Sequence, residues 1–378
     1  MYLTAEADFG LNMLRHAPAN ESLVVSPLSV IFALAMVQMG AKGTTKSQIN
    51  DVLSKGSSDS EIVEHYSDLS SQIRKARNGV KSRIANGFFL DKQFAIEEDY
   101  KESIKESYNA KVKALNFDKA DKAAKIIDGI ISNKTEGRIK DMVNEDMVRG
   151  AYSLIVNAIY FTAEWQEKFY KSASSNKTFH SIAGDKRKFS SMSEWRRHLG
   201  WRRDELMNEF EEHRLYAEDD DFQVLSLPYS DTSFAFNIFL LKKRFGLRAL
   251  RSKLVGEIIQ QLLSTLKKTY ISITIPKMKI ETDFKLKEAL IAMKVSEMFT
   301  DNVDLSGITK EAPLQISDAA HRAIIDVNEE GTTAAAATLF KAIPLSAVMA
   351  EPVKFRANHP FLFILTKDNH PLFMGQFV

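Results

Sequence analysis

The residue types that most often carry catalysis are present in this chain, but not in the spacings that their chemistry requires. No G-x-S-x-G nucleophile elbow and no H-E-x-x-H zinc motif occurs, and the eight histidines are scattered without the spacing of metal ligands. Because there is no cysteine, disulfides, thiolate metal sites and a cysteine nucleophile are excluded. We therefore expect no catalytic residues, no metal and no cofactor, and a protein that is not an enzyme.

Two segments resemble ligand-binding loops only superficially. Residues 40–47 lack the G-x-x-x-x-G-K-S/T spacing of a phosphate-binding loop and follow no strand. Residues 301–307 depart from the spacing of a calcium loop in the same way, so we expect a solvated turn there. Neither segment predicts a ligand.

Charge gives little indication of a polyanionic partner. The chain has 51 Lys and Arg against 49 Asp and Glu, and a net charge of +2 creates no long-range field that would favour nucleic acid or an anionic membrane. Basic residues are concentrated at residues 74–83 and 196–203, in polar surroundings typical of solvated helix faces. Local polyanion binding at these clusters is the alternative.

The most unusual stretch is residues 326–346, DVNEEGTTAAAATLFKAIPLS, which lies between two segments that look like strands. Its four consecutive alanines favour a short surface helix that ends near Pro344. The alternative is an extended segment in which Gly331 is a pivot and the small Thr and Ala side chains fit a crowded, already packed sheet. The residues by themselves leave both interpretations open.

The elements that must position this stretch are predicted from periodicity. Apolar spacings of three and four, with Ser26-Pro27 as one helix start, predict helices at residues 5–16, 28–40, 61–77, 97–108 and 119–134. Apolar runs and period-two alternation predict strands at residues 83–90, 152–161, 270–280, 314–317, 361–365 and 372–377. Because helices and strands do not alternate regularly, the α+β class is favoured over a doubly wound sheet.

Bulk composition favours a single domain covering residues 1–378. The chain is 44% hydrophobic, and its 9 Pro and 16 Gly are spread without a linker-like concentration. The first residues, MYLTAEAD, lack the basic start and apolar run of a signal peptide, and no apolar run approaches the length of a membrane span. We therefore expect a cytoplasmic protein, or an extracellular one if the N-terminus is processed or incomplete.

Five groups of residues, in a fixed order, resemble the serpin family of serine-protease inhibitors from about Asp8 to Val378. They are VVSPLSVIFALAMVQMGAKGTT at 24–45, NAIYF with a following Trp at 157–165, HRA at 321–323, EEGTTAAAAT at 329–338, and NHPFLF with LFMG at 358–363 and 372–375. The resemblance implies an α+β serpin-like fold: a large mixed sheet, smaller sheets, about eight or nine helices and an exposed reactive loop within residues 327–352.

The resemblance also assigns roles to individual residues. Ser26, Ser29, Asn157 and His321 match the family's shutter beneath the main sheet, and Trp165 matches the top of that sheet, where the loop enters. The hinge typical of inhibitory members corresponds to Glu329, Glu330, Gly331, Thr332, Thr333, Ala334, Ala335, Ala336, Ala337 and Thr338.

In the mechanism that the resemblance implies, a protease cleaves the loop, forms an acyl-enzyme and is carried away as the loop inserts into the sheet. The family's spacing from the hinge places the reactive bond at Leu345-Ser346, with Lys341 and Met349 as fallback positions. Residues 332–345 form a 14-residue segment, which as a strand spans about 45 Å. Thr332, Ala334, Ala336 and Thr338 then share one face, and all are small.

A leucine at the cleaved bond suits the apolar primary pocket of a chymotrypsin-like or cathepsin G-like serine protease. A papain-like cysteine protease is the alternative partner. We expect a monomer that acts as a suicide substrate and has neither a nucleic-acid nor a membrane partner. A non-inhibitory serpin that works as a binding or chaperone protein is the runner-up hypothesis, and nothing supports a hydrolase.

The chain departs from the family pattern at residues 193–206, SEWRRHLGWRRDEL. Deleting these 14 residues would join Met192 to Met207 and restore the pair of methionines that the family usually has. We interpret the segment as an insertion that forms a surface protrusion, because long surface insertions cost little closure entropy. The alternatives are a partner site, or an added segment that disrupts a strand and impairs inhibition.

Overall fold

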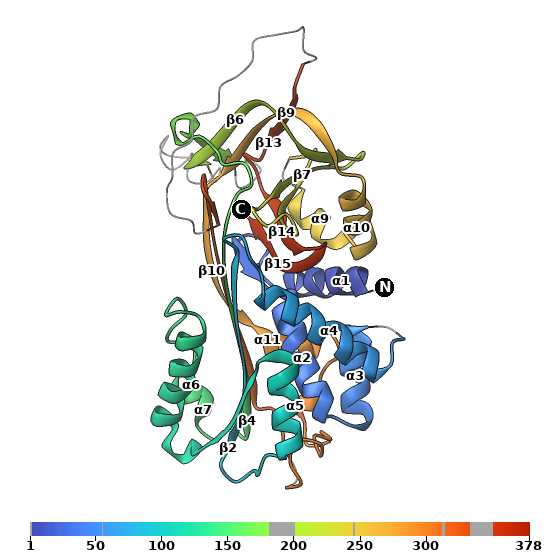
Figure 1. Ribbon diagram of the computed structural model, residues 1–378, viewed down its shortest axis with the longest axis vertical. Helices are drawn as coiled ribbons and strands as arrows, with labels where there is room; N and C mark the ends of the chain where they lie inside the picture. Colours follow the sequence, from blue (N-terminus) through green and yellow to red (C-terminus); the bar gives the residue numbers. More distant parts are fainter. Residues whose placement is uncertain (1, 55, 181–200, 245, 312–313, 333–350) are drawn as a thin grey trace, which may run out of the picture.

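The computed structural model describes residues 2–54, 56–180, 201–244, 246–311, 314–332 and 351–378. Within these ranges the chain folds into two β-sheets and ten α-helices, which confirms the predicted α+β class (Figure 1). None of the described helices is both long enough and apolar enough to cross a membrane.

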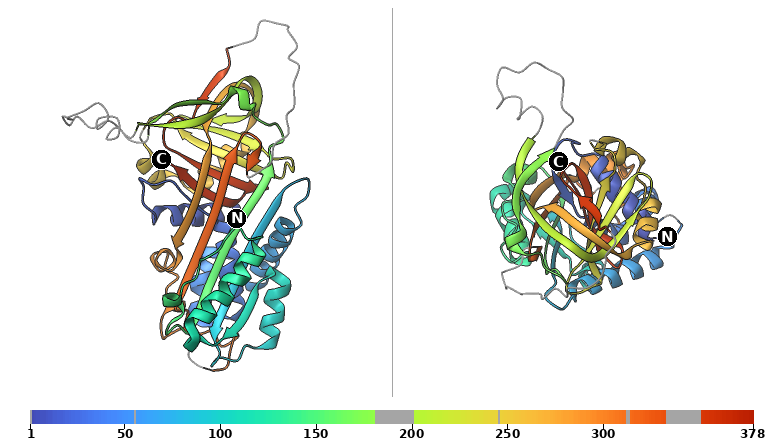
Figure 2. Two further views of the ribbon diagram at one scale, coloured as in Figure 1. Left: turned by 90° about the vertical axis from the view of Figure 1, so that its left-hand side faces the viewer. Right: turned by 90° about the horizontal axis from the view of Figure 1, so that it is seen from above.

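The elongated sheet that Figure 2 shows face-on has six strands in the order β10-β11-β12-β4-β2-β3. It is mixed, because β11 runs parallel to β4 and β2 parallel to β3, whereas the other neighbours are antiparallel. Its strands are β2 (Lys81–Asp91), β3 (Lys111–Leu115), β4 (Ser153–Glu164), β10 (Met278–Lys285), β11 (Asp318–Asn328) and β12 (Gly331–Thr332).

The second sheet has nine strands and lies at the upper end of the molecule in Figure 1. The smaller sheets that the family resemblance implied are thus joined here into one. Its strands are β1 (Leu23–Val25), β5 (Ser175–His180), β6 (Trp201–Glu218), β7 (Phe222–Pro228), β8 (Phe234–Leu241), β9 (Lys267–Pro276), β13 (Val353–Arg356), β14 (Phe361–Lys367) and β15 (His370–Phe377).

Helices cover both faces of the six-stranded sheet (Figure 1). The helices are α1 (Tyr2–Arg15), α2 (Pro27–Gly40), α3 (Gly43–Leu53), α4 (Asp59–Arg74), α5 (Glu98–Tyr108), α6 (Ala120–Lys134), α7 (Glu145–Val148), α9 (Leu247–Lys253), α10 (Gly256–Ser264) and α11 (Leu286–Ala292). Short 3₁₀ turns occur at Phe117–Lys119, Lys171–Ala173 and Glu297–Phe299.

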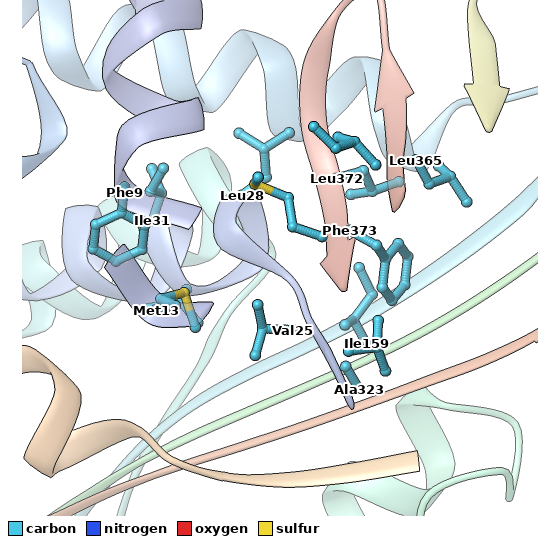
Figure 3. Close-up of a cluster of buried hydrophobic side chains, with 14 of the residues drawn as sticks. Phe9, Met13, Val25, Leu28, Ile31, Ile159, Ala323, Leu365, Leu372 and Phe373 are labelled. Atoms are coloured by element: carbon cyan, nitrogen blue, oxygen red, sulfur yellow. The ribbon is translucent and has the colours of Figure 1, made fainter. Parts of the chain in front are cut away.

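Strand β4 separates two hydrophobic clusters, because successive side chains of a strand point to opposite faces. Ile159 and Phe161 face the larger cluster with α1 and α2, whereas Ala158 and Tyr160 face the smaller cluster with α6 and α7. Helix α2 is buried along every side, which its nearly uninterrupted apolar sequence requires. Figure 3 shows the larger cluster, where side chains of α1, α2, β14 and β15 pack toward Ile159 and Ala323, which are paired across β4 and β11.

Two of the strand predictions were wrong. Residues 270–280 do not form one strand but are divided at Lys277 between β9 and β10, which belong to different sheets. Residues 314–317 alternate in burial but lie before the start of β11, and Ile316 bonds to Met298 instead of to a strand ladder. In both cases the alternation of apolar and polar residues indicates which side chains are buried, but it does not indicate which strand pairs with the segment.

Candidate functional site: the opening of the six-stranded sheet

A row of polar side chains crosses the buried centre of the six-stranded sheet. Asn86 on β2, Asn157 on β4 and His321 on β11 lie directly opposite one another in the strand registers. All three are at most 3% exposed. The row marks the level at which β4 and β11 are neighbours with no strand between them.

Hydrogen bonds connect this row to the start of α2. The backbone N–H of Ser26 donates to Nε2 of His321 at 3.0 Å, so Nε2 must be unprotonated and Nδ1 carries the ring proton. Nδ1 then donates to Oδ1 of Asn157, whose amide nitrogen donates to the carbonyl of Ser29 at 2.9 Å and to Oδ1 of Asn86. This arrangement requires a neutral imidazole.

The protonation state of His321 follows from its surroundings. Burial lowers the pKa of His321 to about 3, and the hydrogen bond with Asn157 opposes that shift only partly. A proton added at Nε2 would remove the acceptor for the Ser26 N–H. A neutral His321 therefore connects β11 to Asn157 of β4 and to the start of α2.

Above this level β4 and β11 separate, and the two-residue strand β12 lies between them. Thr332 pairs with Ala163 of β4 and with Val327 of β11, so Gly331 and Thr332 form a short additional strand at this end of the sheet. The residue before it, Gly331, has a φ of 150°, and a Cβ atom there would lie 2.1 Å from the carbonyl oxygen of Ala163. Only glycine can occupy this position without strain.

Two aromatic residues enclose the end of β12. The rings of Trp165 and Tyr229 stack with their centroids 4.6 Å apart. The indole Nε1 of Trp165 donates to the carbonyl of Asn328 at 2.8 Å, and the Tyr229 hydroxyl bonds with the fully buried Thr332 hydroxyl at 2.7 Å. Both contacts fix the chain as it enters the sheet.

Basic side chains hold the two acidic residues that precede β12. Glu329 pairs with Lys277 at 2.9 Å, and its carboxylate also accepts a hydrogen bond from Ser174 at 2.6 Å. Burial raises the pKa of Glu329, but these hydrogen bonds outweigh burial, so the pKa lies below its ordinary value. The adjacent Glu330 pairs with Lys168 and Lys171, each at 3.1 Å.

A comparison with known families identifies this architecture. A family model described as Serpin (serine protease inhibitor) matches residues 4–378. The chain belongs to the serpin family. It is a serine protease inhibitor and not an enzyme, and its partners are proteases.

Individual serpins are similar over nearly the whole chain. Serine protease inhibitor 42Dd of Drosophila melanogaster is 31% identical over 369 residues, which cover 97% of this chain and 93% of that protein. Antichymotrypsin-2 of Bombyx mori is 29% identical over 359 residues, covering 94% and 92%. The crystal structure of Serpin48 of Tenebrio molitor has a TM-score of 0.85 and 26% identity, covering 99% of this chain and 97% of that one.

The structure brings together the residues expected at the serpin shutter, Ser26, Ser29, Asn157 and His321, and places Trp165 beside the start of the hinge. Of the expected hinge, 329–332 are described, whereas Thr333 to Thr338 and the bond Leu345-Ser346 lie outside the described residues.

Sequence reasoning missed several partners of these serpin residues. Asn86 could have been found as a polar residue within an apolar strand. The partners of the hinge gave no such signal, because they come from three parts of the chain that are far from the hinge in sequence. These are the connection between β4 and β5 with Lys168, Lys171 and Ser174, the end of β7 with Tyr229, and the connection between β9 and β10 with Lys277.

The segment interpreted as an insertion lies only partly within the described residues, which omit 193–200. Residues 201–206 form the first part of β6 and pair with β5, from Trp201 opposite His180 to Leu206 opposite Ser175. This end of the segment is therefore a regular strand of the nine-stranded sheet. Its status as an insertion relative to other serpins stays a prediction.

Proposed function

We propose that this serpin acts as a suicide substrate, cleaved at Leu345-Ser346, and traps a chymotrypsin-like serine protease covalently by inserting the cleaved loop between β4 and β11. The observation that carries the proposal is β12, which already occupies the top of that position. Insertion of the following residues would extend the hydrogen-bonded pairing that β12 already makes with β4 and β11, so no new strand pairing would have to be started.

The register of β12 specifies where each following residue would go. Because Thr332 lies opposite Ala163 and Val327, an unbroken antiparallel ladder would put Thr338 between Asn157 and His321. Residue 342 would reach Ser153, where β4 begins, and Leu345 would lie three residues beyond. A protease attached to Leu345 would thus be carried along the full length of β4, a 12-residue strand of roughly 40 Å.

The alternation of the loop matches the two faces of the sheet. Ala334 and Ala336 would point with Phe161 and Ile159 into the larger cluster, and the odd-numbered hinge residues would point toward α6. Small side chains are needed on both faces, since both are already packed. This requirement favours the strand interpretation of the alanine run over a surface helix.

The target class is proposed from Leu345, whose side chain fits an apolar primary pocket and leaves the buried acid of a trypsin-like pocket unpaired. The name of the silkworm relative, antichymotrypsin-2, agrees with this choice. Cathepsin G-like and papain-like proteases are the next targets to test. A monomeric inhibitor in the cytoplasm remains part of the proposal.

The test is incubation with chymotrypsin, followed by a denaturing gel and identification of the cleaved bond. We expect a complex that survives denaturation, and cleavage after Leu345. Thr332→Arg should be cleaved without forming the complex, because a buried cation cannot enter the position of β12. Thr332→Ala is the matched control, which loses the same hydroxyl but keeps a small side chain, and should still form the complex.

Cleavage of the wild-type protein at Leu345-Ser346 with no stable complex would contradict the proposal for this protease. Heating the protein before and after cleavage then separates the inhibitory from the non-inhibitory hypothesis, because only an inserting loop gives a large gain in thermal stability.

A further inference from the structure

A cluster of three potential metal ligands lies away from the loop-insertion site. Glu6 on α1, His65 on α4 and His370 at the start of β15 come together, although 59 and 364 residues separate the two histidines from Glu6. Nε2 of His65 lies 3.3 Å from one carboxylate oxygen of Glu6, and Nδ1 of His370 lies 2.6 Å from the other. The proposed inhibitory mechanism uses none of these side chains.

The geometry of the cluster is close to that of a zinc site. All three ligand atoms lie within 4.8 Å of one another. Zinc binds imidazole nitrogen and carboxylate oxygen at about 2.0–2.2 Å, so ligand atoms in a tetrahedral site are roughly 3.3–3.5 Å apart. Small side-chain rotations would therefore bring the three atoms to bonding distance of one ion.

Burial and packing favour a preformed site. The side chain of Glu6 is fully buried, whereas those of His65 and His370 are 26% and 16% exposed, so the cluster can be reached from solvent through the two rings. The ring of Tyr2 stacks on His65 with centroids 3.7 Å apart and restricts its rotation.

We propose that Glu6, His65 and His370 bind one zinc(II) ion, which links α1, α4 and the start of β15. The nitrogen of each imidazole that now bonds to the Glu6 carboxylate becomes the ligand atom, so zinc binding requires each ring to move its proton to the other nitrogen. Three elements that are distant in sequence are then joined at one point. The ion stabilises the folded chain and takes no part in protease recognition.

The experiment is a zinc titration of the full chain after treatment with a chelator, against a chromophoric zinc indicator. We expect one zinc ion per chain. His65→Gln and His370→Gln should each weaken binding at least about tenfold, since each removes one of three protein ligands. His16→Gln, at an exposed histidine just after α1, is the matched control and should bind zinc as the wild type does.

A second readout tests the geometry of the site and the fold of each variant. Cobalt(II) should give the visible absorption of a four-coordinate site in the wild type and in His16→Gln only, while far-UV circular dichroism shows that all variants are folded. Zinc should also raise the unfolding temperature of the wild type by a few degrees at a hundredfold excess over its dissociation constant. Absence of micromolar binding, or equal binding by the wild type and both cluster variants, would overturn the site.

Discussion

The neutral His321 makes a defined prediction about stability at acid pH. In the folded protein the pKa of this histidine is about 3, because the ring is buried. In the unfolded chain the pKa is that of an ordinary histidine, 6.5. Between these values the unfolded chain binds a proton that the folded protein does not, so stability falls as the pH falls from 6.5 toward 3.

The size of the effect follows from the two pKa values. Each pH unit within this window changes the free energy of unfolding by about 1.4 kcal/mol per proton, so lowering the pH from 8 to 5 costs about 2 kcal/mol through His321. The full stabilisation by this group is present above pH 6.5. Its complete loss would amount to roughly 4–5 kcal/mol.

The assay is guanidinium unfolding at pH 8, 6.5 and 5, for the wild type and for His321→Gln. The substitution removes the titrating group but leaves an amide that can accept and donate hydrogen bonds. The variant should be less stable at pH 8 and should lose about 2 kcal/mol less than the wild type between pH 8 and 5. If both proteins lose the same stability over that range, the folded pKa of His321 is not low and the assigned hydrogen bonds are wrong. His321→Asn repeats the comparison if His321→Gln unfolds too easily to measure.

Two further predictions concern the entry of the chain into the sheet. Gly331→Ala should expel β12 from the sheet, because the added Cβ would lie 2.1 Å from the Ala163 carbonyl oxygen. The rate of amide hydrogen exchange in β12 should therefore rise. Gly129→Ala is the control and should leave this rate unchanged, because there is open space around Gly129. Unaltered protection of β12 in the first variant would refute this reasoning. Tyr229→Phe should destabilise the protein by about 1–3 kcal/mol in guanidinium unfolding, since it leaves the buried Thr332 hydroxyl without its partner. A midpoint unchanged from the wild type would show that this hydrogen bond does not hold the hinge.

Strands β4 and β11 of the six-stranded sheet are neighbours at the centre of the sheet, whereas β12 separates them at its end. At the centre, β4 and β11 pair directly and the Asn157–His321 hydrogen bond joins them beneath the sheet. At the upper end, residues of the hinge itself separate the two strands. The loop insertion that we propose would have to break the central contacts, so the shutter residues would control how readily the sheet accepts the loop.

Local chemistry made parts of the fold predictable from sequence. Helix α2 begins at Pro27 after the cap Ser26 and ends at Gly40, within one residue of the predicted range, because capping and an apolar stretch are encoded by adjacent residues. The strand predicted at 83–90 lies within β2 for the same kind of reason. Tertiary pairing, by contrast, decided the division of residues 270–280 between two sheets.

The sequence by itself determined the family, the helix α2 and the strand β2. The shutter and hinge roles and the inserting strand stay predictions. Only the tertiary structure decided that β12 lies between β4 and β11, that lysines from two segments hold Glu329 and Glu330, and that Glu6 meets two histidines. The physical reason is the separation along the chain over which each interaction acts. Capping and alternation act between neighbours along the chain, whereas these contacts join residues that become neighbours only when the sheets and helices pack.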